Sequence, residues 1–440
     1  MTHRNFFNHT ALLIVDIVAL ISLFYASGLI RVALSGEDIP LFNSISLADF
    51  VFIIFIILFF MHSEKIYTFR YDFWQESKKI LKSLFLSYLM ALTLLALMKT
   101  NLYYSRLFIT IYFALAMVWI PIIKRIAKRI LYTFNGLNNG VLVLGEVEQV
   151  ELFKKEFQAN FYLGQHYSST AYDSVIIVSK GMSKEVLDGL IARYLNQKGG
   201  LYLVPYVTDI NFVHSNIMEY SNIRYNSIHI ENRLLIRRNL WIKDISDKLV
   251  TFMILPFFLL LHGFITLAIK LDSKGAIFFK QPRLGKGNHD FLCYKYRTMF
   301  ENSEHLLQAY LKEHPEEVSH YQIYHKYKND PRITKVGHVL RATSLDELPQ
   351  ILNILKGEMS LVGPRPYMLN ESAKLANHQE FILKVKPGIT GLWQVSGRNN
   401  LTFKERNELE VWYIKNWFLW DDFVILIKTI KVVLMKIGAK

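Results

Sequence analysis

The sequence has only one cysteine, Cys293, and it has fewer acidic than basic residues. A single thiol excludes an internal disulfide framework and a metal site built from several cysteines. Asp and Glu number 37 against 51 Lys and Arg, which gives a formal net charge of +14. Such an excess is typical of proteins that bind nucleic acid, anionic lipid headgroups or anionic substrates. A cleavable signal peptide is not expected either, because the first apolar segment is too long and lacks a small-residue cleavage site.

Apolar residues are abundant, and they indicate membrane residence. Hydrophobic residues make up 52% and aromatic residues 14% of the chain, so lipids and anionic substrates are favoured over nucleic acid as partners. Four apolar segments open the chain, each near the ~20 residues needed to cross a bilayer. They are residues 11–33, 47–61, 80–97 and 107–123. The distribution of Lys and Arg between them predicts a four-helix transmembrane domain over 1–130 with both ends in the cytoplasm.

Residues 137–232 have the pattern of a small parallel α/β domain. Short apolar runs near 140–145, 174–179 and 200–205 predict buried strands, and 183–196 predicts a helix. A dinucleotide site needs a G-x-G-x-x-G run, but Gly145 is followed by Glu146 and no second glycine. We therefore expect a Rossmann-like domain without its cofactor motif, serving as a structural or regulatory module.

A fifth apolar segment, residues 249–269, is long enough to span a membrane but has basic residues on both sides. A spanning helix is expected to be asymmetric in charge. Pro256 lies within the segment, and proline breaks or kinks a helix. These observations predict a re-entrant helix over about 248–270, broken at Pro256, that enters and leaves on the cytoplasmic face. An ordinary kinked fifth span is the alternative.

Cationic residues recur on two expected strands that follow this segment. Lys295 and Arg297 share one strand face because side chains alternate with period two. Gln281 and Arg283 lie where the preceding strand runs into a turn. These residues are candidates for holding an anionic substrate, and a solvated edge strand is the alternative.

Two adjacent carboxylates, Asp346 and Glu347, are the strongest candidates for catalysis. With Ser344 they also match a capping box, which would give them a purely structural role. Arg341 places a cation nearby, and the helix expected over 348–355 would direct its amino end, a natural phosphate site, at the acidic pair. An acidic pair next to a diphosphate needs a divalent cation, and oxygen ligands point to Mg²⁺, with Asp346 as the metal ligand.

Further C-terminal motifs fit a phosphate or nucleotide ligand. Pro364 and Pro366 fix two φ angles around Arg365, so its guanidinium is aimed with less entropy to lose. Gln394 and Arg398 belong to a glycine-rich loop that suits a nucleotide or a simple turn-rich hairpin. The tail, residues 412–437, suits an amphipathic helix at a membrane surface or on the protein core.

Ordered motifs in the C-terminal half resemble those of the bacterial sugar transferases, a family of monotopic phosphoglycosyl transferases. They are 295–299 (KYRTM), 330–334 (DPRIT), 344–350 (SLDELPQ), 356–366 (KGEMSLVGPRP) and 386–391 (KPGITG). This resemblance implies a small α+β catalytic domain over 237–440. The preceding domains resemble those of the large members, which transfer galactose- or glucose-1-phosphate to undecaprenyl phosphate. The family's Ser-Pro helix break aligns with Leu259 and Leu260 here, so Pro256 lies one turn early.

The resemblance implies a two-step reaction on a UDP-sugar. Asp346 would attack the β-phosphate and release UMP, Glu347 would complete the dyad with Mg²⁺, and Arg341 and Arg365 would hold phosphates. Undecaprenyl phosphate would then accept the sugar phosphate, starting O-antigen, capsule or exopolysaccharide synthesis. We expect a multi-pass protein of the bacterial inner membrane with its catalytic domain on the cytoplasmic face; a homodimer is compatible, and no nucleic acid is involved. The alternatives are a UDP-N-acetylhexosamine-type donor, a transferase that inverts at an anomeric carbon, and a non-catalytic scaffold.

Overall fold

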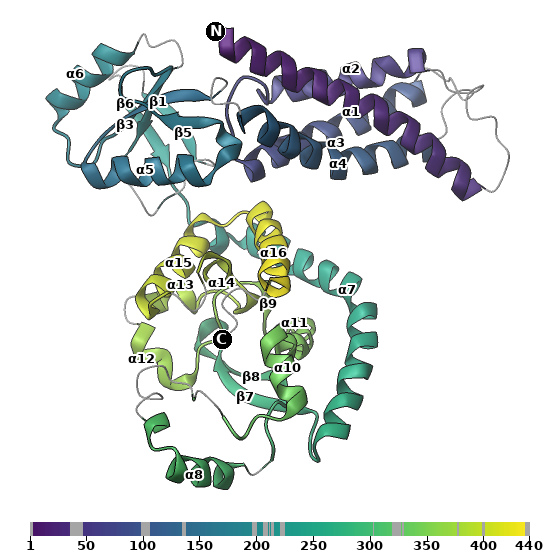
Figure 1. Cartoon of the computed structure of the whole chain (residues 1–440), viewed down its shortest axis with the longest axis vertical. Helices are drawn as coiled ribbons and strands as arrows, with labels where there is room; N and C mark the ends of the chain where they lie inside the picture. The colour runs from purple at the N-terminus through teal and green to yellow at the C-terminus, as the bar shows by residue number, and fades with distance from the viewer. Residues whose placement is uncertain are drawn as a thin grey trace. The chain divides into compact units, whose positions relative to one another are not determined.

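The computed structural model describes most of the 440-residue chain as two compact units, Met1–Val207 and Thr208–Lys440 (Figure 1). The described residues are 3–35, 47–97, 106–133, 138–195, 200–205, 210, 212, 215–220, 225–301, 303–318, 327, 330–375, 378–397 and 401–435.

The first unit opens with four helices that pack along one another (Figure 1). They are α1 (His3–Ser35), α2 (Leu47–Ser63), α3 (Phe73–Leu97) and α4 (Arg106–Thr133). Their contact faces are mainly apolar, with Leu20, Ile57 and Tyr112 fully buried. By length and composition α1 and α4 could cross a membrane, and a third such helix lies in the second unit. These helices indicate an integral membrane protein.

A parallel sheet follows the helices, as the sequence predicts, but it has four strands where the sequence indicated three. Its strand order is β2-β1-β3-β4. The strands are β1 (Asn139–Leu144), β2 (Gln165–Tyr167), β3 (Ser174–Val178) and β4 (Leu201–Val204), with α5 (Val147–Ala159), η2 (Phe161–Leu163) and α6 (Lys184–Tyr194) between them. After β1, Glu146 and Gln149 form a capping box that starts α5.

The helical bundle and the sheet are tied together by charged side chains. Arg70, between α2 and α3, donates to the carbonyls of Leu163 and Gly164 at 3.0 and 2.8 Å. Inside the bundle Lys124 pairs with Asp16 at 2.6 Å, and both side chains are fully buried. A buried ion pair that keeps both partners avoids the cost of an isolated charge.

The second unit begins with the β5–β6 hairpin, which the sequence pattern grouped with the preceding sheet. Its secondary structure comprises β5 (Asn216–Tyr220), β6 (Tyr225–His229), η4 (Arg233–Leu235), α7 (Arg237–Asp272), β7 (Phe278–Leu284), η5 (Lys286–Asn288), β8 (Asp290–Tyr296), α8 (Glu304–Glu313), α10 (Lys335–Thr343), η6 (Leu345–Gln350), α11 (Ile351–Lys356), β9 (Ser360–Val362), η7 (Leu369–Glu371), α12 (Ser372–Leu375), α13 (Gln379–Ile382), β10 (Gly388–Thr390), α14 (Leu392–Ser396), α15 (Phe403–Asn416) and α16 (Leu419–Leu434).

Glycines in the 356–366 and 386–391 motifs allow β9 and β10 to approach each other closely. A Cβ atom on Gly388 would lie 2.1 Å from the amide nitrogen of Gly363, and one on Gly391 would lie 2.4 Å from its carbonyl oxygen. In this arrangement Gly363 donates to Thr390 at 2.9 Å, and Gly388 donates to Pro364 at 2.8 Å. The glycines therefore serve backbone packing, and the strands pair in parallel rather than as a hairpin.

Helix α7 is 36 residues long and continues through Pro256, so the break predicted at Pro256 is wrong for this structure. A proline inside a helix costs about 3 kcal/mol, largely because one backbone hydrogen bond is lost. Contacts with α10, α11 and β9 hold the helix on either side of this residue. Between them the helix exposes large apolar side chains, among them Met253, Phe257 and Phe264.

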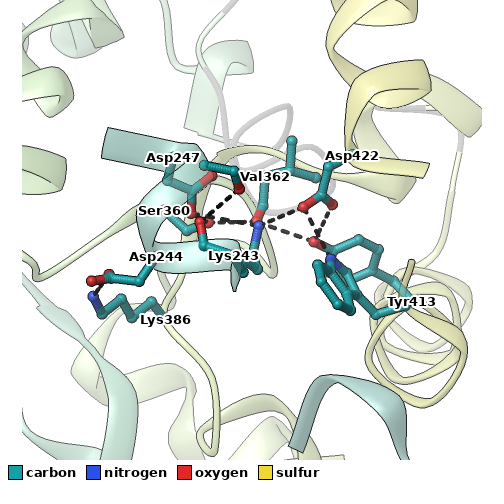
Figure 2. Close-up of polar contacts among 10 residues, drawn as sticks. Lys243, Asp244, Asp247, Ser360, Val362, Lys386, Tyr413 and Asp422 are labelled. Atoms are coloured by element: carbon teal, nitrogen blue, oxygen red, sulfur yellow. Dashed lines mark hydrogen bonds and ion pairs between the residues drawn. The ribbon is translucent and has the colours of Figure 1, made fainter. Parts of the chain in front are cut away.

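A buried polar network anchors the amino-terminal part of α7 (Figure 2). Lys243 donates to Asp422 of α16 at 2.8 Å and lies 3.6 Å from Asp247. Ser360 of β9 donates to Asp247 at 2.5 Å, and Tyr413 of α15 donates to Asp422 at 2.6 Å. One buried cation thus joins α7 to the segments around it.

Candidate active site

The carboxylates Asp346 and Glu347 lie on η6, directly after α10 ends. Ser344 turns the chain between the two elements with a left-handed φ of 56°. It makes no side-chain cap to η6, so the capping box expected from the Ser344–Glu347 spacing does not form. The tight turn places both acids in the first turn of η6, where they are half-buried.

Lys295 is brought to the acidic pair by β8. Its Nζ donates to Glu347 Oε1 at 2.6 Å, with 24% and 34% of the two side chains exposed. Burial alone would lower the pKa of Lys295, but the Glu347 and Asp346 carboxylates raise it above its ordinary value. The cation is therefore held in its charged form beside both acids.

The two acids affect each other as well. Burial, followed by the charge of Glu347, raises the pKa of Asp346, and Lys295 and Arg341 oppose this rise. A raised pKa at a pair of carboxylates is a common property of catalytic sites. The two flanking cations keep such an acid available as an anion.

Arg341 is held in place by Thr298, and the 330–334 motif starts the helix that carries it. It lies in the last turn of α10, and its Nε donates to Thr298 at 2.9 Å. Thr334 caps the same helix by accepting from Gly337 at 2.9 Å. Asp330 binds Arg332 through two hydrogen bonds of 2.9 and 2.8 Å, and this pairing, against the cost of burial, leaves the pKa of Asp330 lowered. The motif therefore builds the turn that starts the Arg341 helix.

Arg283 joins β7 to the Pro-Arg-Pro loop. Its guanidinium donates to the carbonyl of Pro366 at 3.1 Å and to Gln281 Oε1 at 2.6 Å. Burial, followed by the like charge of Arg365, lowers the pKa of Arg283, and the charge of Glu347 also acts on it. Through Arg283 the loop that holds Arg365 is electrostatically linked to the carboxylate pair.

Other sequence-predicted residues lie away from the carboxylates or outside the described chain. Arg297 donates to the carbonyls of Lys274 and Ser273 at 2.7 and 2.8 Å and so closes the carboxyl end of α7. Gln394 donates to the carbonyl of Ile389 at 3.1 Å. Arg398 is not among the described residues. The roles expected of these residues in substrate binding remain predictions.

Two buried polar residues were missed by the sequence reasoning. Asn353 joins β8 to α11, accepting from the amide of Tyr294 at 3.1 Å and donating to the carbonyl of Leu292 at 2.7 Å. Glu410, on α15, accepts from the amide of Arg365 at 2.7 Å. Both side chains are buried, and neither belongs to a motif that would have indicated its role from the sequence.

The donor set at the site is compatible with Mg²⁺. Within the described residues there is no cluster of three or more His, Cys, Asp or Glu side chains placed to hold a metal ion. Magnesium needs few protein ligands, because it keeps several waters and binds substrate phosphates. Asp346 and Glu347 are the carboxylates that would hold it.

These features define a class of protein: a membrane-associated enzyme with a carboxylate pair set among cations, suited to phosphate chemistry. The family model for bacterial sugar transferases matches residues 238–436. The undecaprenyl-phosphate galactose phosphotransferase of Salmonella typhimurium is 32% identical, covering 85% of this chain and 84% of its own. The chain belongs to the bacterial sugar transferase family.

Two other relatives match a smaller share of this chain. The exopolysaccharide production protein ExoY of Sinorhizobium fredii is 44% identical over 42% of this chain and 80% of its own length. The UDP-glucose:undecaprenyl-phosphate glucose-1-phosphate transferase of Xanthomonas campestris is 32% identical over 61% of this chain and 53% of its own.

Proposed function

We propose that this enzyme transfers a hexose-1-phosphate from a UDP-sugar to undecaprenyl phosphate and releases UMP. The relatives' names support the donor and acceptor classes, and they favour galactose or glucose as the sugar. The observation that carries the proposal is the pairing of Lys295 with Glu347 beside Asp346. Such a product would start O-antigen, capsule or exopolysaccharide synthesis.

In the first step a carboxylate oxygen of Asp346 attacks the β-phosphorus of the donor. The bond from that phosphorus to the bridging oxygen breaks, and UMP leaves with the electron pair. In the second step a phosphate oxygen of the polyprenyl acceptor attacks the same phosphorus, and the carboxylate of Asp346 is released. A covalent intermediate of this kind divides one difficult displacement into two easier steps.

The cations around the dyad have separable roles in this scheme. Lys295 holds Glu347 and favours the ionised form of Asp346. Arg341, fixed by Thr298, and Arg365, between its two prolines, would bind phosphate oxygens. Fixed cations of this kind stabilise the charge that develops on a transferring phosphoryl group. Mg²⁺ bound by Asp346 and Glu347 would neutralise diphosphate charge.

Contacts at both ends of α7 support a helix that does not cross the bilayer. Near its start Lys243 donates to Asp422, and at its end Asp272 accepts from the amide of Val336 at 3.0 Å. Because the water-exposed part of the second unit contacts both ends of α7, it holds the two ends of the helix on one side of the membrane. The apolar surface exposed between them would then lie in one leaflet, beside the lipid acceptor. The basic residues and the nucleotide donor favour the cytoplasmic face.

The test is product analysis with purified enzyme, undecaprenyl phosphate and a panel of UDP-hexoses and UDP-N-acetylhexosamines. We expect UMP, with UDP-galactose or UDP-glucose as the best donor. UDP as the product would support the transferase that inverts at the anomeric carbon. Absence of any nucleotide product with every donor would favour the non-catalytic scaffold.

A further inference from the structure

The Pro364-Arg365-Pro366 loop has a single backbone donor. Proline has no backbone N–H, so Arg365 carries the only amide hydrogen of the three residues. Glu410 Oε1 accepts it at 2.7 Å. Glu410 lies in α15, is 2% exposed, and is 45 residues away in sequence. A long-range contact therefore holds the one donor that the loop can offer.

The carbonyl groups of the loop are held by different partners. Pro364 accepts from the amide of Gly388 at 2.8 Å, and Pro366 accepts from Arg283 at 3.1 Å. Tyr367 accepts from the amide of Leu284 at 2.9 Å. These contacts fix the loop against β7 and β10. The Pro364 carbonyl and the Arg365 N–H belong to one peptide group, so Gly388 holds this group on its carbonyl side and Glu410 holds it on its amide side.

The second oxygen of Glu410 is also engaged. The Tyr367 hydroxyl bonds to Oε2 of Glu410 and lies 2.8 Å from Oδ1 of Asn407. Tyr367 is fully buried, so the carboxyl group is fixed at both oxygens by residues that flank or face the loop. A side chain that is held at both of its oxygens can position a neighbouring residue with little further loss of entropy.

Burial raises the pKa of Glu410 to about 7, against the opposing effects of the Arg365 amide, the Tyr367 hydroxyl and the charges of Arg406 and Arg365. Within the described part of the chain the Arg365 guanidinium makes no hydrogen bond or ion pair. Its backbone is thus anchored while its side chain stays available for a ligand.

We propose that Glu410 is the positioning residue of Arg365: it fixes the loop backbone so that the guanidinium meets a phosphate of the donor. The inference rests on the proposed function, in which Arg365 binds that phosphate. Glu410 itself contacts neither substrate nor the reacting atoms. Its effect on turnover therefore passes through Arg365.

The kinetic test compares Glu410→Asp, Glu410→Gln, Arg365→Ala and the double variant Glu410→Asp/Arg365→Ala by UMP release. Asp keeps the charge but is one methylene too short to reach the amide, whereas Gln keeps the acceptor. We expect Glu410→Asp to lower kcat/KM for the donor by about ten- to a hundredfold, chiefly by raising KM. Glu410→Gln should stay within about threefold of the wild type near pH 7.

The double variant separates positioning from a general loss of structure. If Glu410 acts through Arg365, Glu410→Asp should cost at most twofold in the Arg365→Ala background. Tyr367→Phe is the matched control, because it alters the other oxygen of Glu410 and leaves the Arg365 bond; its effect should be smaller than that of Glu410→Asp. Full additivity in the double variant, or wild-type KM in Glu410→Asp, would overturn the inference.

Hydrogen exchange supplies a readout that does not depend on activity. Because both neighbouring prolines lack amides, the exchange of Arg365 can be assigned without overlap from residues 364 and 366. We expect slow exchange in the wild type and in Glu410→Gln, and at least tenfold faster exchange in Glu410→Asp. Slow exchange in all three would refute the anchor. Wild-type enzyme that releases no UMP from any donor would instead refute the proposed function, and the exchange data would still decide whether Glu410 holds the loop.

Discussion

Replacing Lys295 with Met should move the acid limb of the pH profile of kcat/KM for UMP release to higher pH. Lys295 and Arg341 are the cations that oppose the rise in the pKa of Asp346. Removing one of them removes stabilisation from the carboxylate form, so the pKa of the acid rises further. A nucleophilic carboxylate must be ionised to attack phosphorus. The fraction of active enzyme at a given acidic pH therefore falls.

The size of this change follows from the usual effect of a neighbouring cation on an acid, because Lys295 pairs with Glu347 at 2.6 Å and its charge acts on Asp346. An opposite charge within about 4–6 Å lowers the pKa of an acid by roughly 1–3 units. Lys295 has 24% of its side chain exposed, so solvent screens part of its charge. We therefore take the low end, a loss of roughly 1.4 kcal/mol in the stabilisation of the carboxylate form. At a fixed pH on the acid limb, the ratio of kcat/KM to its plateau value should be about tenfold lower in Lys295→Met than in the wild type.

The assay is kcat/KM for UMP release from about pH 5 to 9, with Lys295→Arg as the control. The plateau of Lys295→Met falls too if Lys295 contacts the donor, so the position of the limb is the quantity compared. It reports an apparent pKa of the coupled pair Asp346 and Glu347. Lys295→Arg keeps the charge, and its limb should stay in place. A limb that stays or moves to lower pH in Lys295→Met would refute the reasoning.

Three further outcomes test other parts of the account. Thorough chelation should abolish UMP release, and added Mg²⁺ should restore it; full activity in chelator would remove the metal from the scheme. In a Cys293→Ser background, Ser246→Cys and Lys274→Cys should both be labelled only from the cytoplasmic side, and labelling of the second from outside would mean that α7 crosses the bilayer. Lys243→Met should destabilise the enzyme by about 3–5 kcal/mol, because it leaves Asp422 and Asp247 buried without their cation; a Tm within two or three degrees of the wild type would show that the network contributes little.

The sequence revealed the elements whose signal is local. Apolar segments predicted α1 to α4, and short apolar runs predicted β1, β3 and β4 of the parallel sheet. Strand β2 was missed because it spans three residues, Gln165–Tyr167, and has no buried run. A strand this short is defined by its pairing with β1 rather than by its composition.

The candidate site was predictable in its residue types but not in its pairings. Asp346, Glu347 and Lys295 were all candidates, yet the ion pair joins residues 52 apart in sequence, which no spacing rule gives. Arg297 was grouped with Lys295 by strand alternation, but its guanidinium turns to the end of α7. Glu410 carried no motif, and its importance appears only when α15 packs against the Pro-Arg-Pro loop.

The most direct test of the central claim is whether the enzyme forms a covalent sugar-phosphate adduct on Asp346. Wild-type protein would be mixed with the UDP-sugar in the absence of undecaprenyl phosphate, quenched and examined by intact-mass and peptide mass spectrometry. We predict a hexose-phosphate adduct on the peptide that contains Asp346, released by adding the lipid acceptor, and no adduct in a folded Asp346→Asn variant. Normal UMP release by Asp346→Asn, or an adduct on another residue, would contradict the account.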